Sequence, residues 1–155
     1  MAHRIRMVGA GAGTRLDTVD SVATEKVAAA DTGETYELFE IDAPGGSGIP
    51  PHRHEWPEAY FVLDGALDVA VGGRSFHMGP GDTLTVPPRA VHTFSVPTPR
   101  CRFLSFSLGA GAGRLFAELD LEVPDGPPDQ VVPVVIEVAA RHGVTFVPDR
   151  PGPAA

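Results

Sequence analysis

Short runs in which apolar and polar residues alternate dominate the first two thirds of the chain. Such runs, bounded by glycine, proline and aspartate, are typical of β-strands with one face buried. The runs with this character cover residues 21–30, 35–43, 58–63, 66–71, 74–78, 83–86, 92–96 and 102–108. Because turns rather than helices separate them, they predict an all-β sandwich or barrel.

Turn signals support this interpretation. Gly72-Gly73 lies between two predicted strands and is a two-residue hairpin signal. The glycine repeat at 8–13 resembles a nucleotide-binding loop, but a dinucleotide fingerprint needs a strand before it and a helix after it. Extended, polar residues follow at 14–20, so we expect a flexible turn there instead.

The period of the pattern changes after the glycine-rich segment 109–113. Leu115, Phe116 and Leu119 are apolar at helical spacing and predict a short helix over 114–119.

A second helix is expected after the proline-rich linker 124–128. The pattern predicts it over about 130–142, with Asp129 as its N-cap and Gly143 just beyond its end. Residues 144–148 are expected to pack back as an extended segment.

Composition narrows the class of protein. With 155 residues, 18 glycines and 16 prolines, the chain suits a single domain of short strands and tight turns. A net charge of −8 argues against nucleic-acid binding, which leaves a basic footprint. One cysteine, Cys101, and no apolar run of membrane-spanning length or secretory type lead us to expect a cytoplasmic protein without membrane contact.

The most informative segment contains His52, His54 and Glu58. Residues i and i+2 of an extended strand point to one face, so the two imidazoles aim at one point. A tight turn through 55–57 can bring the Glu58 carboxylate to the same point. Two neutral imidazoles and a carboxylate suit a divalent transition metal, and His92 is a fourth candidate ligand.

The segment from Gly46 to Gly65 resembles the first motif of the cupin superfamily at every fixed position: glycine, five residues, HxH, three residues, Glu, six residues, Gly. Gly81, Pro87 and His92 resemble the second motif. Arg89 stands where that family has glycine, which puts the shape of this turn in doubt. Val96 stands where asparagine, which is not a ligand, often occurs.

This resemblance implies a cupin β-barrel, also called a double-stranded β-helix or jelly roll, with short C-terminal helices. We expect N-terminal strands of the barrel at 1–34, the barrel core with both motifs at 35–110, and C-terminal helices and tail at 111–155, all in one domain. The closing segment 141–146, RHGVTF, looks like the end of single-domain cupins of the quercetin dioxygenase-like group.

The resemblance also implies one divalent ion per chain, which could be Fe, Ni, Mn, Co or Zn, held by His52, His54, Glu58 and His92. Glu58 is in addition the candidate general base, as in quercetinases. Side chains that share the ligand faces, or lie in the turn between ligands, are expected to form the substrate pocket: Trp56, Tyr60, Val62, Phe94 and Val96.

Three functions are compatible with such a site. The first is a dioxygenase acting on an enol, phenolic or aromatic substrate with dioxygen. The second is a non-redox isomerase, lyase or cyclase, as in polyketide tailoring, and the third is a binding module without chemistry. Because the run 35–43 has mixed faces and cupins commonly pair through their sheets, a homodimer is also expected.

Overall fold

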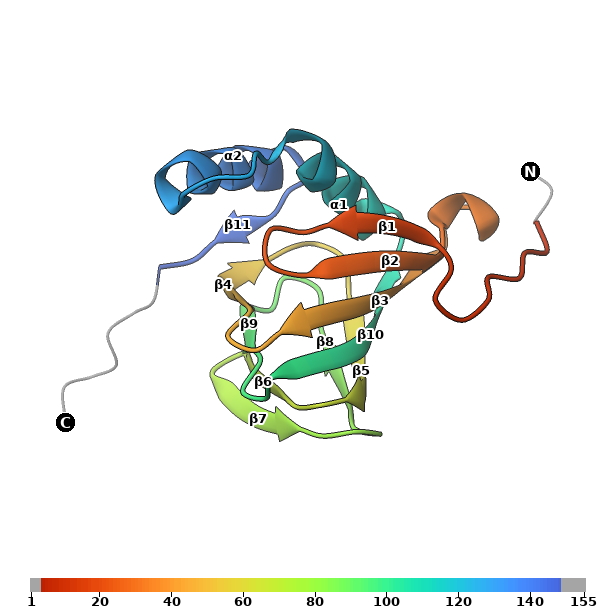
Figure 1. The fold of residues 1–155 in the computed structure, drawn as a ribbon, viewed down its shortest axis with the longest axis horizontal. Helices are drawn as coiled ribbons and strands as arrows, with labels where there is room; N and C mark the ends of the chain where they lie inside the picture. The colour runs from red at the N-terminus through yellow and green to blue at the C-terminus, as the bar shows by residue number, and fades with distance from the viewer. Residues whose placement is uncertain (1–3, 149–155) are drawn as a thin grey trace.

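The computed structural model describes residues 4–148, so the end of the expected tail lies outside them. Two antiparallel sheets pack face to face (Figure 1). The six-stranded sheet has the order β1 (Thr14–Asp17), β2 (Val22–Val27), β3 (Tyr36–Pro44), β10 (Arg100–Leu108), β5 (Glu58–Asp64), β8 (Thr83–Val86). The five-stranded sheet has the order β11 (Thr145–Phe146), β4 (Gly48–Arg53), β9 (His92–Ser95), β6 (Leu67–Val71), β7 (Arg74–Met78). The predicted all-β, jelly-roll fold is confirmed.

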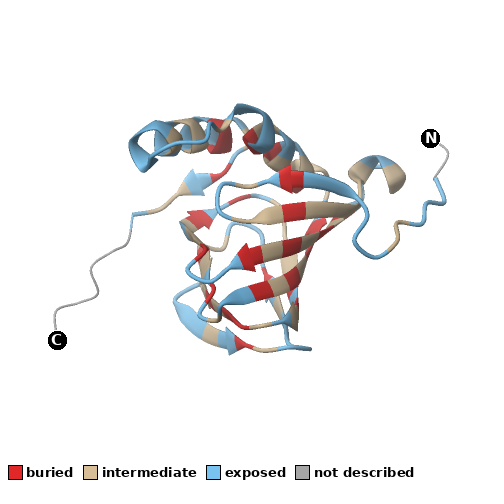
Figure 2. Cartoon of the chain, in the orientation of Figure 1, coloured by how far each residue is buried: buried red, intermediate tan, exposed pale blue. Residues whose placement is uncertain are grey.

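Strand alternation builds the core between the sheets. On β3, Phe39, Ile41 and Ala43 are buried while their neighbours face outward, and β10 buries Cys101 and Phe103 in the same way. The banding of buried and exposed residues along these strands is visible in Figure 2. Burial of this apolar area is the main term that stabilises the sandwich.

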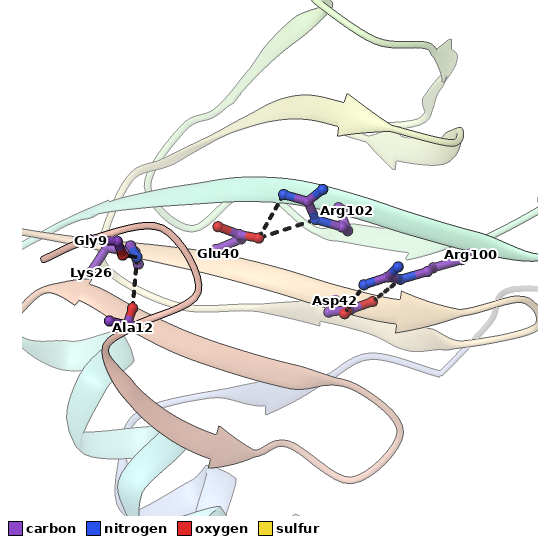
Figure 3. Close-up of polar contacts among 7 residues, drawn as sticks. All are labelled: Gly9, Ala12, Lys26, Glu40, Asp42, Arg100 and Arg102. Carbon is purple, nitrogen blue, oxygen red and sulfur yellow. Dashed lines mark hydrogen bonds and ion pairs between the residues drawn. The ribbon is translucent and has the colours of Figure 1, made fainter.

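On the outer face of the larger sheet, charged residues of β3 and β10 pair across the strands (Figure 3). Arg100 Nε lies 2.7 Å from Asp42 Oδ1, and Arg102 Nη2 lies 2.9 Å from Glu40 Oε1. These are partly exposed pairs, so they add little to stability and mainly favour this strand register.

Lys26 explains the N-terminal glycine repeat. Its ammonium donates to the carbonyl oxygens of Gly9, at 2.6 Å, and Ala12, at 2.7 Å (Figure 3). The segment turns at 9–12 and leads into β1 without a helix, as its context predicts.

In the turn before β9, arginine stands at the position of the motif glycine and adopts a left-handed conformation. Arg89 has φ of +63°, a left-handed conformation that glycine adopts at no steric cost. Its backbone N–H donates to the His54 carbonyl at 2.8 Å, and this bond helps to hold a conformation that costs about 1–2 kcal/mol.

Some predicted boundaries were wrong. The run 21–30 is strand only to Val27 and continues as a single 3₁₀ turn, Ala29–Asp31. The helix expected from residue 114 begins earlier, as α1 (Gly111–Glu122). The second helix, α2 (Pro128–Arg141), begins after Pro127, so Asp129 lies in its first turn instead of capping it. A proline at the first helical position explains this, because its fixed φ suits a helix start.

Close contact explains why α1 begins within glycines. A Cβ atom at Gly111 would lie 2.6 Å from the Trp56 ring, and one at Gly113 would overlap a carboxylate oxygen of Glu37. The Gly113 N–H donates to Glu37 at 3.0 Å. Burial raises the pKa of Glu37, whereas the helix N-terminus favours its anion. The helix is therefore joined to the barrel by Glu37 of β3 and by Trp56 of the turn before β5.

Both helices lie along one end of the sandwich, above β1 and β11 (Figure 1). They share an apolar cluster with Val144, the residue before the last strand: Leu115, Leu119, Val138, Ala139 and Val144. The expected extended tail is present as β11, which pairs with β4. Among residues 4–148, no helix has the length and apolar character needed to cross a membrane.

Candidate metal centre

Three histidines meet inside the barrel. His52 lies on β4 and His92 opens β9, where the two residues face each other across the strands, and His54 follows β4 directly. All three are buried, and one ligand atom from each lies within 4.8 Å of the others. Two neighbouring strands of one sheet thus bring the two predicted motifs together.

The second nitrogen of each ring has a backbone partner. His52 Nδ1 donates to the Pro50 carbonyl at 2.9 Å, and His54 Nδ1 donates to the Trp56 carbonyl at 2.9 Å. His92 Nδ1 donates to the Ala90 carbonyl at 2.8 Å. A carbonyl only accepts, so Nδ1 must carry the proton, and in the neutral ring Nε2 then keeps its lone pair. Such bonds orient histidines as metal ligands.

Glu58 begins β5 on the opposite sheet and reaches the same centre. Its Oε1 lies 2.9 Å from His92 Nε2 and 3.6 Å from His54 Nε2. The Tyr60 hydroxyl donates to the same oxygen at 2.5 Å. Glu58 is not part of the tight group of three histidines, so its role as a fourth ligand stays a prediction.

Electrostatics in the site follow from burial and from these contacts. Burial, reinforced by His92, lowers the pKa of His52 to about 4, which keeps that ring neutral. Burial would raise the pKa of Glu58, but His54 and His92 beside it lower that pKa below its ordinary value. Burial and the Glu58 carboxylate raise the pKa of Tyr60, so its hydroxyl remains a donor.

These residues fit a metal ion. His92 Nε2 is buried and has no hydrogen-bond partner of suitable geometry within residues 4–148, although Glu58 is close. Burying a polar atom without a partner is costly, and a metal ion would satisfy it. Three imidazole nitrogens with an adjacent carboxylate form a donor set for a divalent transition metal, and this three-histidine cluster could hold one.

Trp56 packs beside the centre. Its ring stacks on His54, with ring centroids 4.0 Å apart and planes 8° from parallel, while its other side meets Gly111 of α1. The tryptophan therefore joins the histidine cluster to the first helix and limits the movement of the His54 ring.

A cavity of about 200 Å³ opens onto the site, and His52, His54 and Glu58 are among its lining residues. Its walls are mainly apolar and partly aromatic. The barrel side includes Ile41, Ile49, Phe94 and Phe103, the helical side includes Leu115, Phe116 and Val135, and Phe146 comes from β11. A small, mostly apolar molecule would fit this space.

The five predicted pocket residues divide into two groups. Trp56, Tyr60 and Phe94 line the cavity. Val62 and Val96 are buried in the hydrophobic core instead, further along the same strand faces. Contact of any of these residues with a substrate stays a prediction.

Sequence reasoning missed other parts of the wall. Phe103 and Ser105 lie on the inward face of β10, and the alternation on that strand was the signal that could have found them. The wall residues from α1, α2 and the turn 18–21 had no such signal, because only the packing of the helices and of this hairpin on the barrel brings them to the site.

Comparisons with known proteins agree with this geometry. A family model described as "Cupin domain" matches residues 38–106. The quercetin 2,3-dioxygenase of Bacillus subtilis (strain 168) is 25% identical over 112 residues, which are 72% of this chain and 33% of that enzyme. The chain therefore spans only about a third of that relative's length.

Solved structures show the same fold. The polyketide cyclase RemF from Streptomyces resistomycificus has a TM-score of 0.61 at 23% identity, over 68% of this chain and 80% of that one. An RmlC-like cupin from Shewanella frigidimarina has a TM-score of 0.61 at 18% identity, over 71% of this chain and 96% of that one. Residues 38–106 thus match the cupin domain, and the chain shares the fold of these solved structures.

Proposed function

We propose that this protein is a metal-dependent enzyme, a dioxygenase that acts on an enol, phenolic or other aromatic substrate. The observation that carries the proposal is an apolar, aromatic-lined cavity that opens directly onto a buried cluster of three histidines with an adjacent carboxylate. The likeness to a quercetin 2,3-dioxygenase supports the same class of reaction.

In the proposed mechanism, His52, His54 and His92 hold the ion, with Glu58 as a fourth ligand or as a free base. A bound divalent metal would supply Lewis acidity toward a substrate hydroxyl and, if redox-active, a route for electrons to dioxygen. The metal could be Fe, Ni, Mn, Co or Zn, since this donor set suits all of them.

The protein's own groups handle the proton. The lowered pKa of Glu58 keeps its carboxylate ionised near neutral pH, so it can accept a proton from the substrate. Phenolic and enolic hydroxyls are weaker acids than a carboxylic acid, so this proton transfer would require a bound metal to lower the pKa of the substrate hydroxyl. Tyr60 holds the carboxylate by its hydrogen bond, and the apolar walls exclude bulk water.

Oxygen uptake tests the proposal. The protein, loaded separately with each candidate metal, is mixed with a panel of enols and phenols that includes quercetin. We expect a redox-active metal to give one dioxygen consumed per substrate molecule, measured with an oxygen electrode and by product mass. Equal turnover under argon would contradict the dioxygenase and favour the alternative below, and no turnover with any substrate would favour a binding module.

The alternative is a non-redox isomerase, lyase or cyclase, such as a polyketide-tailoring enzyme. The donor set also suits zinc, which supplies Lewis acidity without redox chemistry. The RemF cyclase shares the fold, but at that identity the likeness carries no further weight.

We also propose that the chain forms a homodimer through the outer face of its six-stranded sheet. An apolar patch lies there, consisting of Tyr36, Phe61, Phe106 and Leu108, each 38–44% exposed. The neighbouring arginines pair with carboxylates of the same sheet. Two copies related by a twofold axis would therefore bury apolar area without opposing unpaired like charges.

Light scattering checks the dimer. We expect the wild type to have twice the mass of one chain at micromolar concentration and Phe106→Glu to have the mass of one chain. Ile136→Glu, at an exposed position on α2, is the matched control and should remain dimeric. A wild-type monomer throughout this range would rule the proposal out.

A further inference from the structure

The exposed residues among those lining the cavity show where it meets solvent. Most of its wall is buried or half-buried, but Val19, Asp20 and Pro50 are exposed. Val19 and Asp20 form the tip of the hairpin between β1 and β2, and Pro50 belongs to β4. In Figure 1 this tip lies close to β4, to which Asp20 is hydrogen-bonded through the Gly48 N–H. The mouth of the cavity is therefore between the hairpin tip and β4.

Val19 has an unusual backbone conformation. Its φ is +79°, in the left-handed region where a β-branched residue is a genuine outlier. The residue is also 53% exposed, so burial of the isopropyl group offers little compensation. Glycine would fit this conformation without strain. Backbone strain that the surroundings maintain is found preferentially at functional sites.

Hydrogen bonds on both sides hold the tip in place. Toward β4, the Asp20 carboxylate accepts from the Gly48 N–H at 2.8 Å, and the Ser47 hydroxyl donates to the Asp20 carbonyl at 3.0 Å. Toward α1, the Asp17 N–H donates to Asp120 at 2.8 Å. The hairpin is thus attached to the barrel and to a helix of the cavity wall, and Val19 is fixed between them at the mouth.

We propose that Val19 is the gate of the cavity. Its side chain covers part of the mouth and thereby limits the size of molecules that reach the histidines and the rate at which they arrive. The proposal rests on the cavity being the ligand site of the proposed function, but it does not depend on which reaction occurs there.

The protein contains a reporter for this test. Its single tryptophan, Trp56, lines the cavity and stacks on His54. Collisional quenching of its fluorescence by acrylamide measures how often a small neutral molecule enters. Quenching on addition of Co²⁺ to the metal-free protein, followed by stopped flow, measures how fast an ion reaches the histidines.

We expect Val19→Gly to increase the acrylamide quenching constant and the Co²⁺ association rate severalfold, and the longer side chain of Val19→Leu to decrease both. Glu34→Gly is the matched control, because Glu34 also has a positive φ, of +59°, and is not a lining residue. It should relieve comparable strain and raise thermal stability while leaving both rates unchanged.

The proposal is overturned if Val19→Gly gains stability as Glu34→Gly does but leaves both rates at the wild-type value. Val19 would then be a strained turn residue only. Because neither measurement involves turnover, the result is independent of the oxygen-uptake experiment, so failure of the gate and failure of the proposed reaction can be distinguished.

Discussion

Replacing both His52 and His54 with alanine is expected to remove the bound metal. The two rings supply two of the three Nε2 atoms that converge in the barrel. Loss of a residue that only hydrogen-bonds to a metal ligand typically lowers metal affinity 10–100-fold. Loss of two ligands should therefore lower metal affinity by more than about 100-fold. Elemental analysis of dialysed protein gives the metal content per chain.

The matched control is His77→Ala. His77 is exposed on β7, paired with Asp68 and outside the cluster, so its loss should leave the metal content unchanged. Circular dichroism establishes that both variants are folded. A double variant that is folded and retains the wild-type metal content would mean that these histidines do not form the site.

Glu58→Gln is expected to reduce turnover by about 10²–10⁴-fold, the usual contribution of a positioned general base. The amide keeps the length of the side chain and an oxygen that can accept from Tyr60, but it cannot take a proton at neutral pH. Three histidines remain to hold the ion. Activity should therefore fall much further than metal content, and both are measured on one sample.

Glu55→Gln is the control for this experiment. Glu55 lies in the turn between the ligands, but it is exposed, and its carboxylate is 3.9 Å from the Arg89 side chain. Its substitution should change neither quantity. Near wild-type turnover in metal-replete Glu58→Gln would remove Glu58 from the mechanism, and a parallel loss of metal and activity would indicate that it acts as a ligand only.

Local geometry made the histidines predictable. The spacing of His52 and His54 places them on one face of an extended chain, and a tight turn can bring Glu58 to the same point. Resemblance to the two cupin motifs then supported Glu58 and His92 as candidate ligands. The hairpin at Gly72-Gly73 was equally predictable from the sequence, and both glycines have positive φ. Such features depend on a few consecutive residues, so the sequence is sufficient for them.

Features that depend on packing were not predictable in the same way. The start of α1 within a glycine run depends on the approach of Trp56 and Glu37, which lie far away in the chain. Val62 and Val96 share strand faces with cavity residues, but they lie further along the strands, where core side chains fill the interior of the barrel. Alternation predicts the face of a strand but not the depth at which a cavity ends.

The placement of α1 and α2 over the cavity has a consequence for how this protein can evolve. The three histidines lie within residues 38–106, the segment that matches the cupin domain, whereas Leu115, Phe116 and Val135 of the wall lie beyond it. Part of the cavity wall is thus encoded outside the stretch that carries the histidines, although Ile41, Phe94 and Phe103 of the wall lie within that stretch. Mutations in the C-terminal stretch can therefore alter which molecules fit the cavity while all three histidines stay in place.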